Sequence, residues 1–550
     1  MNELQGMALL TLATLAVVFA LARRRLELSL AKHPSLTGHS RMARRIAAQV
    51  PGYTYDEAAF FASDGAPPEV QERRRAGFMN LAATLAARHP KSVALTREAR
   101  TTISDLQFTS AYRVPFQYSA YLRQHLTLGT FVQRTDGVMV TDLDGQSFLD
   151  LTGSYGVNVF GHDFYKSCMA EGSRRAAELG VVLGSYHPSV AFNAAELCRI
   201  SGLDEVSFHM SGTEAVMQAV RLARYHTGRR QLVRFSGAYH GWWEDVQPGP
   251  GNPLPPGHTY TLKDMDADTL RVLRKRKDIA CVLVNPLQAL HPNKSAPGDG
   301  SLIDSSRSAR FDREAYAAWL RQLRDVCTAH GIVLIIDEVF MGFRLAAGGA
   351  QAYFGVQADM VIYGKTLGGG LPVGVVCGKR ELMKRYRESR PADICFARGT
   401  FNAHPHVMCT MQVFLERLRS VSVRALYSDL DGTWNRRAEQ LNIRLRTAGL
   451  PVQVANLQTI WTLSYMQPSR YNWMLQFYLR EQGVALSWVG TGRFIFSLNF
   501  SEANFEDFCT RMLAAAQAMQ ADGWWWQGPS LTNSAIRRGV LKEIIQHRLR

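Results

Sequence analysis

Gly331-Ile-Val-Leu-Ile-Ile-Asp337-Glu338-Val339 places a run of five apolar residues immediately before two carboxylates. The run is too short for a typical helix and is rich in β-branched side chains, so it predicts a strand that is buried on both faces. A second apolar run, Met360-Val-Ile-Tyr363, is followed by Lys365 and then by the glycines 368 to 370. We therefore expect Lys365 where a strand gives way to a tight loop.

An acidic residue and a lysine at the carboxyl ends of neighbouring parallel strands are typical of a site for pyridoxal phosphate. The amine of Lys365 can form a Schiff base with the aldehyde of this cofactor, and the carboxylate of Asp337 can keep the pyridine nitrogen protonated. The alternative for either residue alone is structural, with Asp337 capping a loop and Lys365 as a solvated charge. Together with the motifs below, the two residues predict a catalytic cofactor site.

Two longer motifs carry a family resemblance. Asp337-Glu-Val-Phe-Met-Gly-Phe-Arg344 and Gly364-Lys-Thr-Leu-Gly-Gly-Gly-Leu-Pro-Val-Gly374 resemble those of the class III aminotransferases, and most closely those of glutamate-1-semialdehyde aminomutases. The resemblance extends from about Phe131 to about Met519. It implies the type I fold of pyridoxal-phosphate-dependent transferases, in which a large domain with a mostly parallel central sheet is joined to a smaller α+β domain.

A strand, a glycine turn and a helix are expected around Ser211-Gly212-Thr213. Free backbone N–H groups and the helix dipole converge at such a helix start, so these residues predict a site for the cofactor phosphate, with a simple helix cap as the alternative. In the family that the chain resembles, the aromatic residue of the motif Gly237-Ala-Tyr239-His240-Gly241 stacks on the pyridine ring. The resemblance therefore implies that role for Tyr239, with His240 beside it and Val339 on the opposite face of the ring.

The resemblance also indicates a substrate pocket. Ser154 and Tyr155 stand where the family has Gly-Ser-Trp-Gly beside its substrate, and simple core packing is the equally weighted alternative for them. Asn285 replaces a glutamate of the family pattern, which removes one negative charge near the cofactor. For the arginine that binds the substrate carboxylate in family members, Arg113 and Arg134 are candidates by position only.

Thr400 indicates a second subunit. It lies in Ala397-Arg-Gly-Thr400-Phe401, which resembles a family segment whose threonine reaches the cofactor phosphate of the neighbouring subunit. The resemblance thus implies a homodimer with active sites at the subunit interface.

Composition limits the other partners. The 550 residues are 46% hydrophobic, which is ample for a large globular core, and the formal charge is +16. The arginines are dispersed, without zinc-finger spacing or a long basic block, so we expect no nucleic acid as a partner. The eight cysteines show no metal-ligand spacing and predict a reducing compartment without a metal site.

An uncharged apolar segment near the amino terminus predicts contact with a membrane. From Leu4 to Ala22 it has nineteen residues, close to the roughly 20 that span a bilayer, and Arg23, Arg24 and Arg25 follow at once. By the positive-inside rule this order predicts a single-pass anchor with the catalytic part on the cytoplasmic side. A helix that lies on the membrane, or one that is buried in protein, is the alternative.

We expect six segments along the chain. They are a membrane anchor (1–25), a helical extension (26–125), the first part of the small domain (126–165), the large cofactor-binding domain (166–415), the second part of the small domain (416–523) and a tryptophan-rich basic tail (524–550). The tail either contacts a bilayer interface or packs against the extension or a partner subunit.

Transamination is the favoured reaction, in which an amine donor passes its nitrogen to an aldehyde or ketone. The predicted anchor favours a lipophilic biosynthetic intermediate at the membrane as the acceptor. A glutamate-1-semialdehyde type of aminomutase is the alternative within the family. A catalytically inactive, membrane-associated protein that keeps the fold is the alternative of another class.

Overall fold

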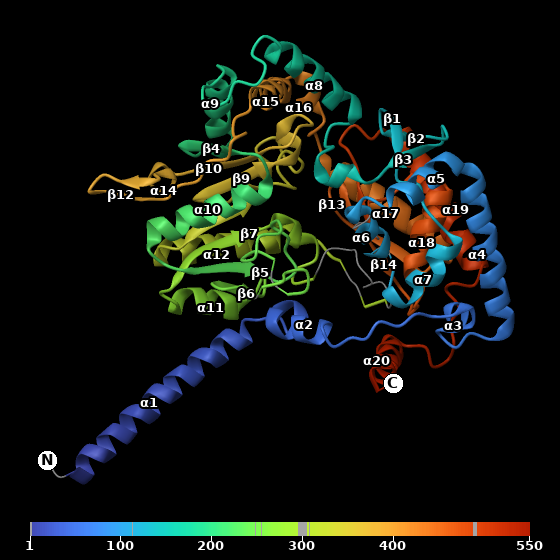
Figure 1. Cartoon of the computed structure of the whole chain (residues 1–550), viewed down its shortest axis with the longest axis horizontal. Helices are drawn as coiled ribbons and strands as arrows, with labels where there is room; N and C mark the ends of the chain where they lie inside the picture. Colours follow the sequence, from blue (N-terminus) through green and yellow to red (C-terminus); the bar gives the residue numbers. More distant parts are fainter. Residues whose placement is uncertain are drawn as a thin grey trace.

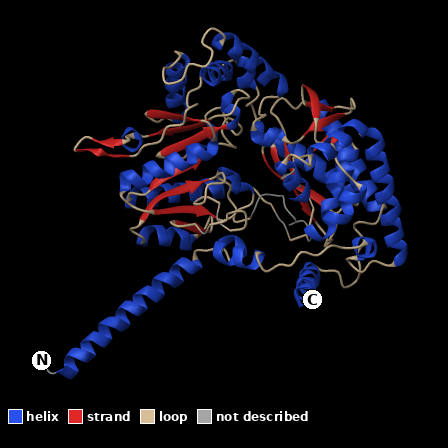
Figure 2. Ribbon diagram, viewed as in Figure 1, coloured by secondary structure: helices blue, strands red, loops and turns tan. Residues whose placement is uncertain are grey.

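Two groups of strands organise the molecule (Figure 2). The structure, a computed structural model, describes residues 3–112, 114–247, 249–254, 256–294, 305–306, 309–487 and 492–549. A large domain surrounds one group of strands, and a small domain, covered by amino-terminal helices, surrounds the other (Figure 1).

A seven-stranded sheet in the order β4-β10-β9-β8-β7-β5-β6 forms the centre of the large domain. Strands β5 to β9 run parallel to one another, while β10 is antiparallel to both of its neighbours, β4 and β9. This confirms the prediction of a mostly parallel sheet. The strands are β4 (Glu205–His209), β5 (Gln231–Phe235), β6 (Thr259–Leu262), β7 (Ile279–Val284), β8 (Val333–Asp337), β9 (Met360–Gly364) and β10 (Gly374–Gly378).

Helices bury both faces of this sheet, which explains why β8 is apolar at successive positions. Val333 and Ile335 belong to the core cluster that contains α10, whereas Leu334 and Ile336 belong to the cluster that contains α12. The helices of the large domain are α8 (His162–Ala176), α9 (Ser189–Ser201), α10 (Gly212–Thr227), α11 (Ala267–Lys275), α12 (Arg313–His330), α13 (Gly349–Phe354), α14 (Arg380–Met383) and α15 (Pro405–Leu418).

The small domain combines segments from both halves of the chain. One sheet has the order β1-β2-β3-β15, and a second has the order β13-β14-β16. The strands are β1 (Val132–Asp136), β2 (Met139–Asp142), β3 (Ser147–Asp150), β13 (Val452–Leu457), β14 (Ile460–Tyr465), β15 (Val484–Ala485) and β16 (Arg493–Ile495). Its helices are α16 (Val421–Ala425), α17 (Leu430–Thr447), α18 (Leu475–Glu481) and α19 (Glu502–Ala521).

The segment before the small domain is helical. It comprises α2 (Ser40–Ala47), α3 (Glu57–Ala62), α4 (Pro68–Arg88), α5 (Pro90–Ala99), α6 (Ser104–Tyr112) and α7 (Phe116–His125). The carboxyl-terminal tail ends in α20 (Asn533–Leu549). A hairpin of β11 (Tyr386–Arg387) and β12 (Arg390–Ile394) projects from the large domain (Figure 1).

Helix α1 (Glu3–Leu30) extends away from the body, and its last turns join α11 (Figure 1). There, Lys275 Nζ lies 2.5 Å from Glu27 Oε1. In the part of the chain that the structure describes, no helix has both the length and the apolar character needed to cross a membrane. The predicted single-pass anchor is therefore not confirmed, and the helix itself continues beyond the predicted boundary at residue 25.

Trp524 and Trp525 of the tail are buried in the body of the protein. Trp524 is fully buried, and its ring contacts those of Phe60 and Phe61 in α3. Trp525 donates its indole N–H to Asn472 Oδ1 at 3.0 Å. Packing against the extension, one of the alternatives for the tail, therefore describes Trp524, whereas Trp525 contacts the small domain.

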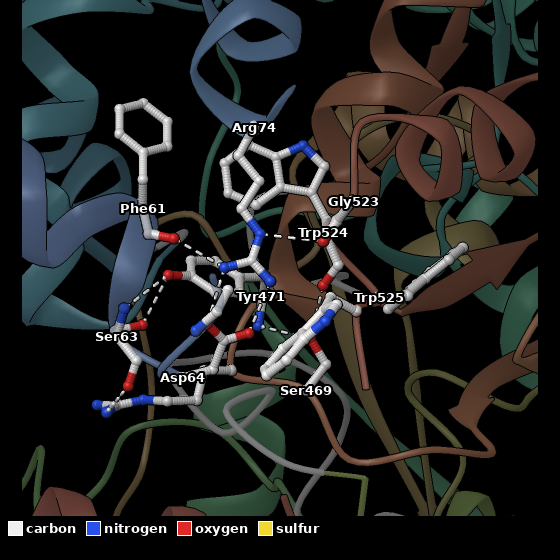
Figure 3. Close-up of polar contacts among 12 residues, drawn as sticks. Phe61, Ser63, Asp64, Arg74, Ser469, Tyr471, Gly523, Trp524 and Trp525 are labelled. Carbon is white, nitrogen blue, oxygen red and sulfur yellow. Dashed lines mark hydrogen bonds and ion pairs between the residues drawn. The ribbon is translucent and has the colours of Figure 1, made fainter. Parts of the chain in front are cut away.

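Arg74 holds the extension, the small domain and the tail together (Figure 3). Its guanidinium forms a two-pronged ion pair with Asp64 at 2.8 and 2.7 Å, and both side chains are almost fully buried. It also donates to the carbonyl oxygens of Phe61 and Gly523, at 2.7 and 3.0 Å, and lies 4.4 Å from the centre of the Tyr471 ring. A buried charge with this many partners fixes the relative position of three distant segments.

We predict that Arg74→Leu lowers the free energy of unfolding by about 3–5 kcal/mol, because it leaves the Asp64 carboxylate buried without its partner. The neighbouring Arg75→Leu is the control, since the ion pair of Arg75 with Glu57 has side chains that are 45% and 50% exposed. Loss of that pair costs less than about 1 kcal/mol. Denaturant unfolding followed by tryptophan fluorescence measures both, and equal losses would contradict the role assigned to Arg74.

Candidate active site

The two carboxylates at the end of β8 have different partners. Asp337 is buried, and its Oδ2 lies 2.7 Å from Nδ1 of His240 while its Oδ1 accepts from the N–H of Val339. Burial lowers the pKa of His240, so a neutral ring donates from Nδ1 to Asp337. Glu338 instead accepts from the N–H groups of residues 350 and 351 in α13, and burial raises its pKa to about 7. Only Asp337 is therefore aligned with His240.

Lys365 lies directly after β9, beside the strand that carries Asp337. Its backbone has the left-handed φ of 48°, which marks a strained turn at a functional position. Burial, and further the positive charges of Arg344 and Arg493, lower the pKa of the Lys365 amine to about 8, although Asp337 opposes this shift. The Lys365 Nζ lies 4.5 Å from the centre of the Phe340 ring. An amine in this state exchanges a proton readily near neutral pH.

The start of α10 forms a close-packed corner beside Val339. A Cβ on Gly212 would lie 2.9 Å from Val339 Cγ1, and a Cβ on Gly364 would lie 3.3 Å from the same atom. A Cβ on Gly241 would lie 2.4 Å from Thr213 Oγ1. Glycines are thus required where the segment after β4, the end of β9 and the His240 loop meet.

The first N–H groups of α10 lie at this corner. Ser211 acts as its amino-terminal cap, with its hydroxyl accepting from the N–H of Glu214 at 3.3 Å. This is the cap expected as the alternative role for Ser211. The N–H groups of Gly212 and Thr213 remain at the start of the helix, where free donors and the helix dipole favour an anion.

Tyr239 and Asn285 are linked. The Tyr239 side chain is 61% exposed, and desolvation at its hydroxyl, followed by the negative charge of nearby Asp337, raises the pKa of Tyr239. Asn285 is buried, donates to the backbone oxygen of Tyr239 at 2.8 Å, and accepts from the N–H of Leu287. Asn285 therefore holds the backbone of Tyr239, which is the residue predicted to stack on the cofactor ring.

The Ser154-Tyr155 turn approaches Lys365 from the small domain. Both residues have left-handed φ values, 44° and 56°, and Tyr155 is 45% exposed. A Cβ on Gly156 would lie 2.6 Å from Phe340, the ring that contacts Lys365. The turn and the lysine thus share Phe340 as a neighbour.

Arg493 is a site residue that the sequence analysis missed. It is 8% exposed, its positive charge acts on Lys365, and its Nη2 lies 3.4 Å from Nε2 of His291. It shares a face of β16 with Ile495, which contacts Gly153 at the start of the pocket turn. A charged residue in the apolar strand Arg493-Phe-Ile-Phe was the available signal, since buried arginines are rare without a specific contact.

Arg344 ties the loop after Asp337 to the small domain. Its buried guanidinium donates to the carbonyl oxygens of Asn158 and Phe496, at 3.0 and 2.7 Å, and to the hydroxyl of Thr459 at 3.0 Å. These acceptors are all neutral, and burial lowers the pKa of Arg344 to about 10. Its uncompensated charge is one of those that lower the pKa of Lys365.

Two predicted residues lie outside this cluster. Thr400 is exposed on the loop that precedes α15, and Arg134 is exposed on β1. Arg113 lies outside the described residues.

Comparison with known proteins agrees with this geometry. The family model for class III aminotransferases matches residues 120–516. A transaminase structure with pyridoxal phosphate bound is 26% identical, with a TM-score of 0.64 over 79% of this chain and 99% of that one. An omega-transaminase from Sphaerobacter thermophilus is 25% identical, with a TM-score of 0.63 and the same coverage.

An aminomutase shares the fold. The glutamate-1-semialdehyde aminomutase from Pseudomonas aeruginosa PAO1 is 20% identical, with a TM-score of 0.63 over 82% of this chain and 99% of that one. The family resemblance of the motifs around Asp337 and Lys365 is confirmed, since the family model covers well over half of the residues. The chain belongs to the class III aminotransferase family.

Proposed function

We propose that the protein is a pyridoxal-phosphate-dependent aminotransferase that moves an amino group from an amine donor to an aldehyde or ketone. The observation that carries this proposal is the pairing of Asp337 and Lys365 at the carboxyl ends of adjacent parallel strands. Ligands of open α/β sheets bind at such strand ends. The buried carboxylate and the amine with a lowered pKa are the two groups that this chemistry requires.

The residues around Lys365 fit the cofactor. Asp337, oriented by His240, would hold the pyridine nitrogen, and the N–H groups of Gly212 and Thr213 would hold the phosphate. The Tyr239 ring and Val339 would enclose the two faces of the cofactor ring. When bound, pyridoxal phosphate supplies an aldehyde and a ring that withdraws electrons from the reacting carbon.

Lys365 would act as the proton carrier. With a pKa of about 8, its Nζ can accept a proton from the α-carbon of the donor near neutral pH. The ammonium that results would donate a proton in the later step, when the acceptor is aminated. Phe340 packs beside this amine, the turn at Gly156 packs on Phe340, and both would help to exclude water from the amine. The positive charges of Arg344 and Arg493 favour the neutral amine over the ammonium.

Arg493 would bind an anionic group of the donor or the acceptor. It offers a buried guanidinium near Lys365, and an arginine fork matches the geometry of a carboxylate. We therefore propose that at least one substrate carries a carboxylate, oriented by Arg493 from the small domain.

The functional unit would be a homodimer. The exposed Thr400 loop is available to a second copy of the chain, and the aromatic rings of Tyr239, Trp242 and Phe401 are also exposed. In this arrangement Thr400 would complete the phosphate site of the partner. A monomeric mass by light scattering of the purified protein would contradict it.

The acceptor would be lipophilic. This part of the proposal is supported by the apolar side chains that α1 exposes, which suit an enzyme that takes its substrate from a lipid phase. A series of aldehydes of increasing chain length tests it, with rising kcat/KM expected along the series. Equal use of short, soluble aldehydes would reject a lipophilic acceptor.

We predict that adding an amine donor to the holoenzyme converts the visible band of lysine-bound cofactor to that of the aminated cofactor and releases one carbonyl product. The Lys365→Ala variant would lack the visible band. Its rate would be about 10²–10⁴-fold lower, because proton transfer by Lys365 is lost. Absorption spectra and product analysis measure both. Release of an isomer that keeps the nitrogen would identify an aminomutase instead, and a protein without the band would be an inactive relative.

We predict that Arg493→Met raises the KM for a carboxylate-bearing substrate by about 10- to 100-fold, because hydrogen bonds to charged groups contribute about 1.5–3 kcal/mol. The KM for an uncharged amine would not change. The same variant would raise the pKa of Lys365 above about 8, since a positive charge that disfavours the ammonium is removed.

The pH dependence of cofactor capture by the apoprotein reports that pKa, because capture requires the neutral amine. Arg436→Met, at an exposed position of α17, is the matched control and should change neither quantity. An unchanged KM and an unchanged pH midpoint in the Arg493 variant would exclude this residue from the site.

A further inference from the structure

Helix α1 exposes an apolar surface on all of its sides. From Met7 to Leu21 its large apolar side chains are 54–73% exposed, over a length of about 22 Å. The helix stands away from the body in Figure 1, and its last turns attach it to α11 through Arg24 and Glu27. Exposed apolar surface of this size marks an interaction site. One groove of a folded protein covers only one face of a helix, whereas the interior of a lipid layer surrounds it.

Positive charge follows directly after this apolar surface. Between Arg23 and Ala48 the chain has seven lysine or arginine residues and one acidic residue, Glu27. Glu27 is already engaged by Lys275. Burial, and then the charge of Arg41, lower the pKa of Lys32, so these two cations of the segment act on one another.

Helix α2 is amphipathic and partly unpartnered. Ala43 is buried against the body, while the side chains of Met42 and Ile46 are 55% and 41% exposed. Arg41, Arg44 and Arg45 lie on the same short helix. Exposed apolar and basic side chains on one helix are typical of a segment that lies in a membrane interface.

The three arginines of α2 line a hollow of about 800 Å³ together with the loop 250–252. Arg44 donates to the backbone oxygen of Pro253, which fixes one side of the hollow. Among the residues that the structure describes, no carboxylate forms an ion pair with Arg41, Arg44 or Arg45. A hollow with this lining suits anionic phosphate groups.

The carboxyl terminus of the chain extends this basic surface. The Arg548 guanidinium at the end of α20 donates to the side chain of Gln49, directly after α2, at 3.2 Å. In Figure 1, α2 and α20 lie on the side of the molecule from which α1 departs.

We propose that α1, α2 and the loop 249–254 form a docking surface for an anionic lipid bilayer. The apolar side chains of α1 enter the lipid layer, and the arginines of α2 bind phosphates of the lipid headgroups. Loop 249–254 continues from the segment that carries Tyr239 and His240, and Asn252 holds it by donating to the backbone oxygen of Glu244. Docking therefore brings the lipid surface next to a loop that is held to Glu244, a few residues after Tyr239 and His240.

Co-sedimentation of the full-length holoenzyme with vesicles tests this surface. We expect binding to vesicles of phosphatidylcholine mixed with an equal amount of phosphatidylglycerol to be at least about tenfold tighter than to phosphatidylcholine alone, because each basic residue near an anionic surface adds to affinity. The triple variant Arg41→Glu, Arg44→Glu, Arg45→Glu should lose this preference. The double variant Leu10→Glu, Leu15→Glu should weaken binding to both kinds of vesicle.

Arg424→Glu is the matched control, since this exposed arginine lies on α16 at the opposite end of the molecule (Figure 1). It should bind mixed vesicles like the wild type. Turnover of a soluble donor should be unchanged in all variants, which shows that each is folded. Equal binding to both vesicle types by the wild type, or an Arg424→Glu loss as large as that of the triple variant, would overturn the proposal.

Discussion

The site depends on one constraint, which is that β8 and β9 end side by side with a carboxylate on one and an amine on the other. Burial of either group alone is unfavourable, and the fold meets this cost in two ways. Asp337 receives hydrogen bonds from His240 and from a backbone N–H. Lys365 is surrounded so that its neutral form becomes accessible near pH 8.

The glycines of the site follow from the same geometry. Val339 lies directly after the two carboxylates, and it packs so closely on residues 212 and 364 that neither position has room for a side chain. The helix start at Gly212 is thereby fixed relative to Asp337 and Lys365. The distance between the expected anion site at the start of α10 and the carboxylate of Asp337 is thus set by the packing of Val339 on the glycine backbone.

Two buried arginines hold the domains in the arrangement that the site needs. Arg344 connects the loop after Asp337 to three segments of the small domain, at Asn158, Thr459 and Phe496, so the segments that carry Tyr155 and Arg493 are held to that loop. Arg74 connects the helical extension and the tail to the same small domain. Each guanidinium has several acceptors from distant parts of the chain, which makes domain position and site geometry parts of one network.

The sheet and the centre of the site could be predicted from the sequence because they depend on local patterns. Apolar runs that end in Asp337 and Lys365 specify buried parallel strands, and a hydroxyl residue before a helix specifies its cap at Ser211. Arg493 was missed because its role comes from the packing of β16 against the pocket turn, which local sequence does not encode. The hydrogen bond from Asn285 to the backbone of Tyr239 could not be predicted, since the neighbours of Asn285 are set by tertiary structure.

The ends of the chain show the same limit. A helix at the amino terminus was predicted from its apolar residues, whereas the predicted crossing of a membrane is not confirmed. For Trp524, composition left open whether it meets lipid or protein, and the structure buries it against α3.

The central claim is that Lys365 holds the cofactor, and borohydride reduction of the holoenzyme followed by peptide mass spectrometry tests it most directly. The account predicts a pyridoxyl label on Lys365, and a label on another lysine would contradict it.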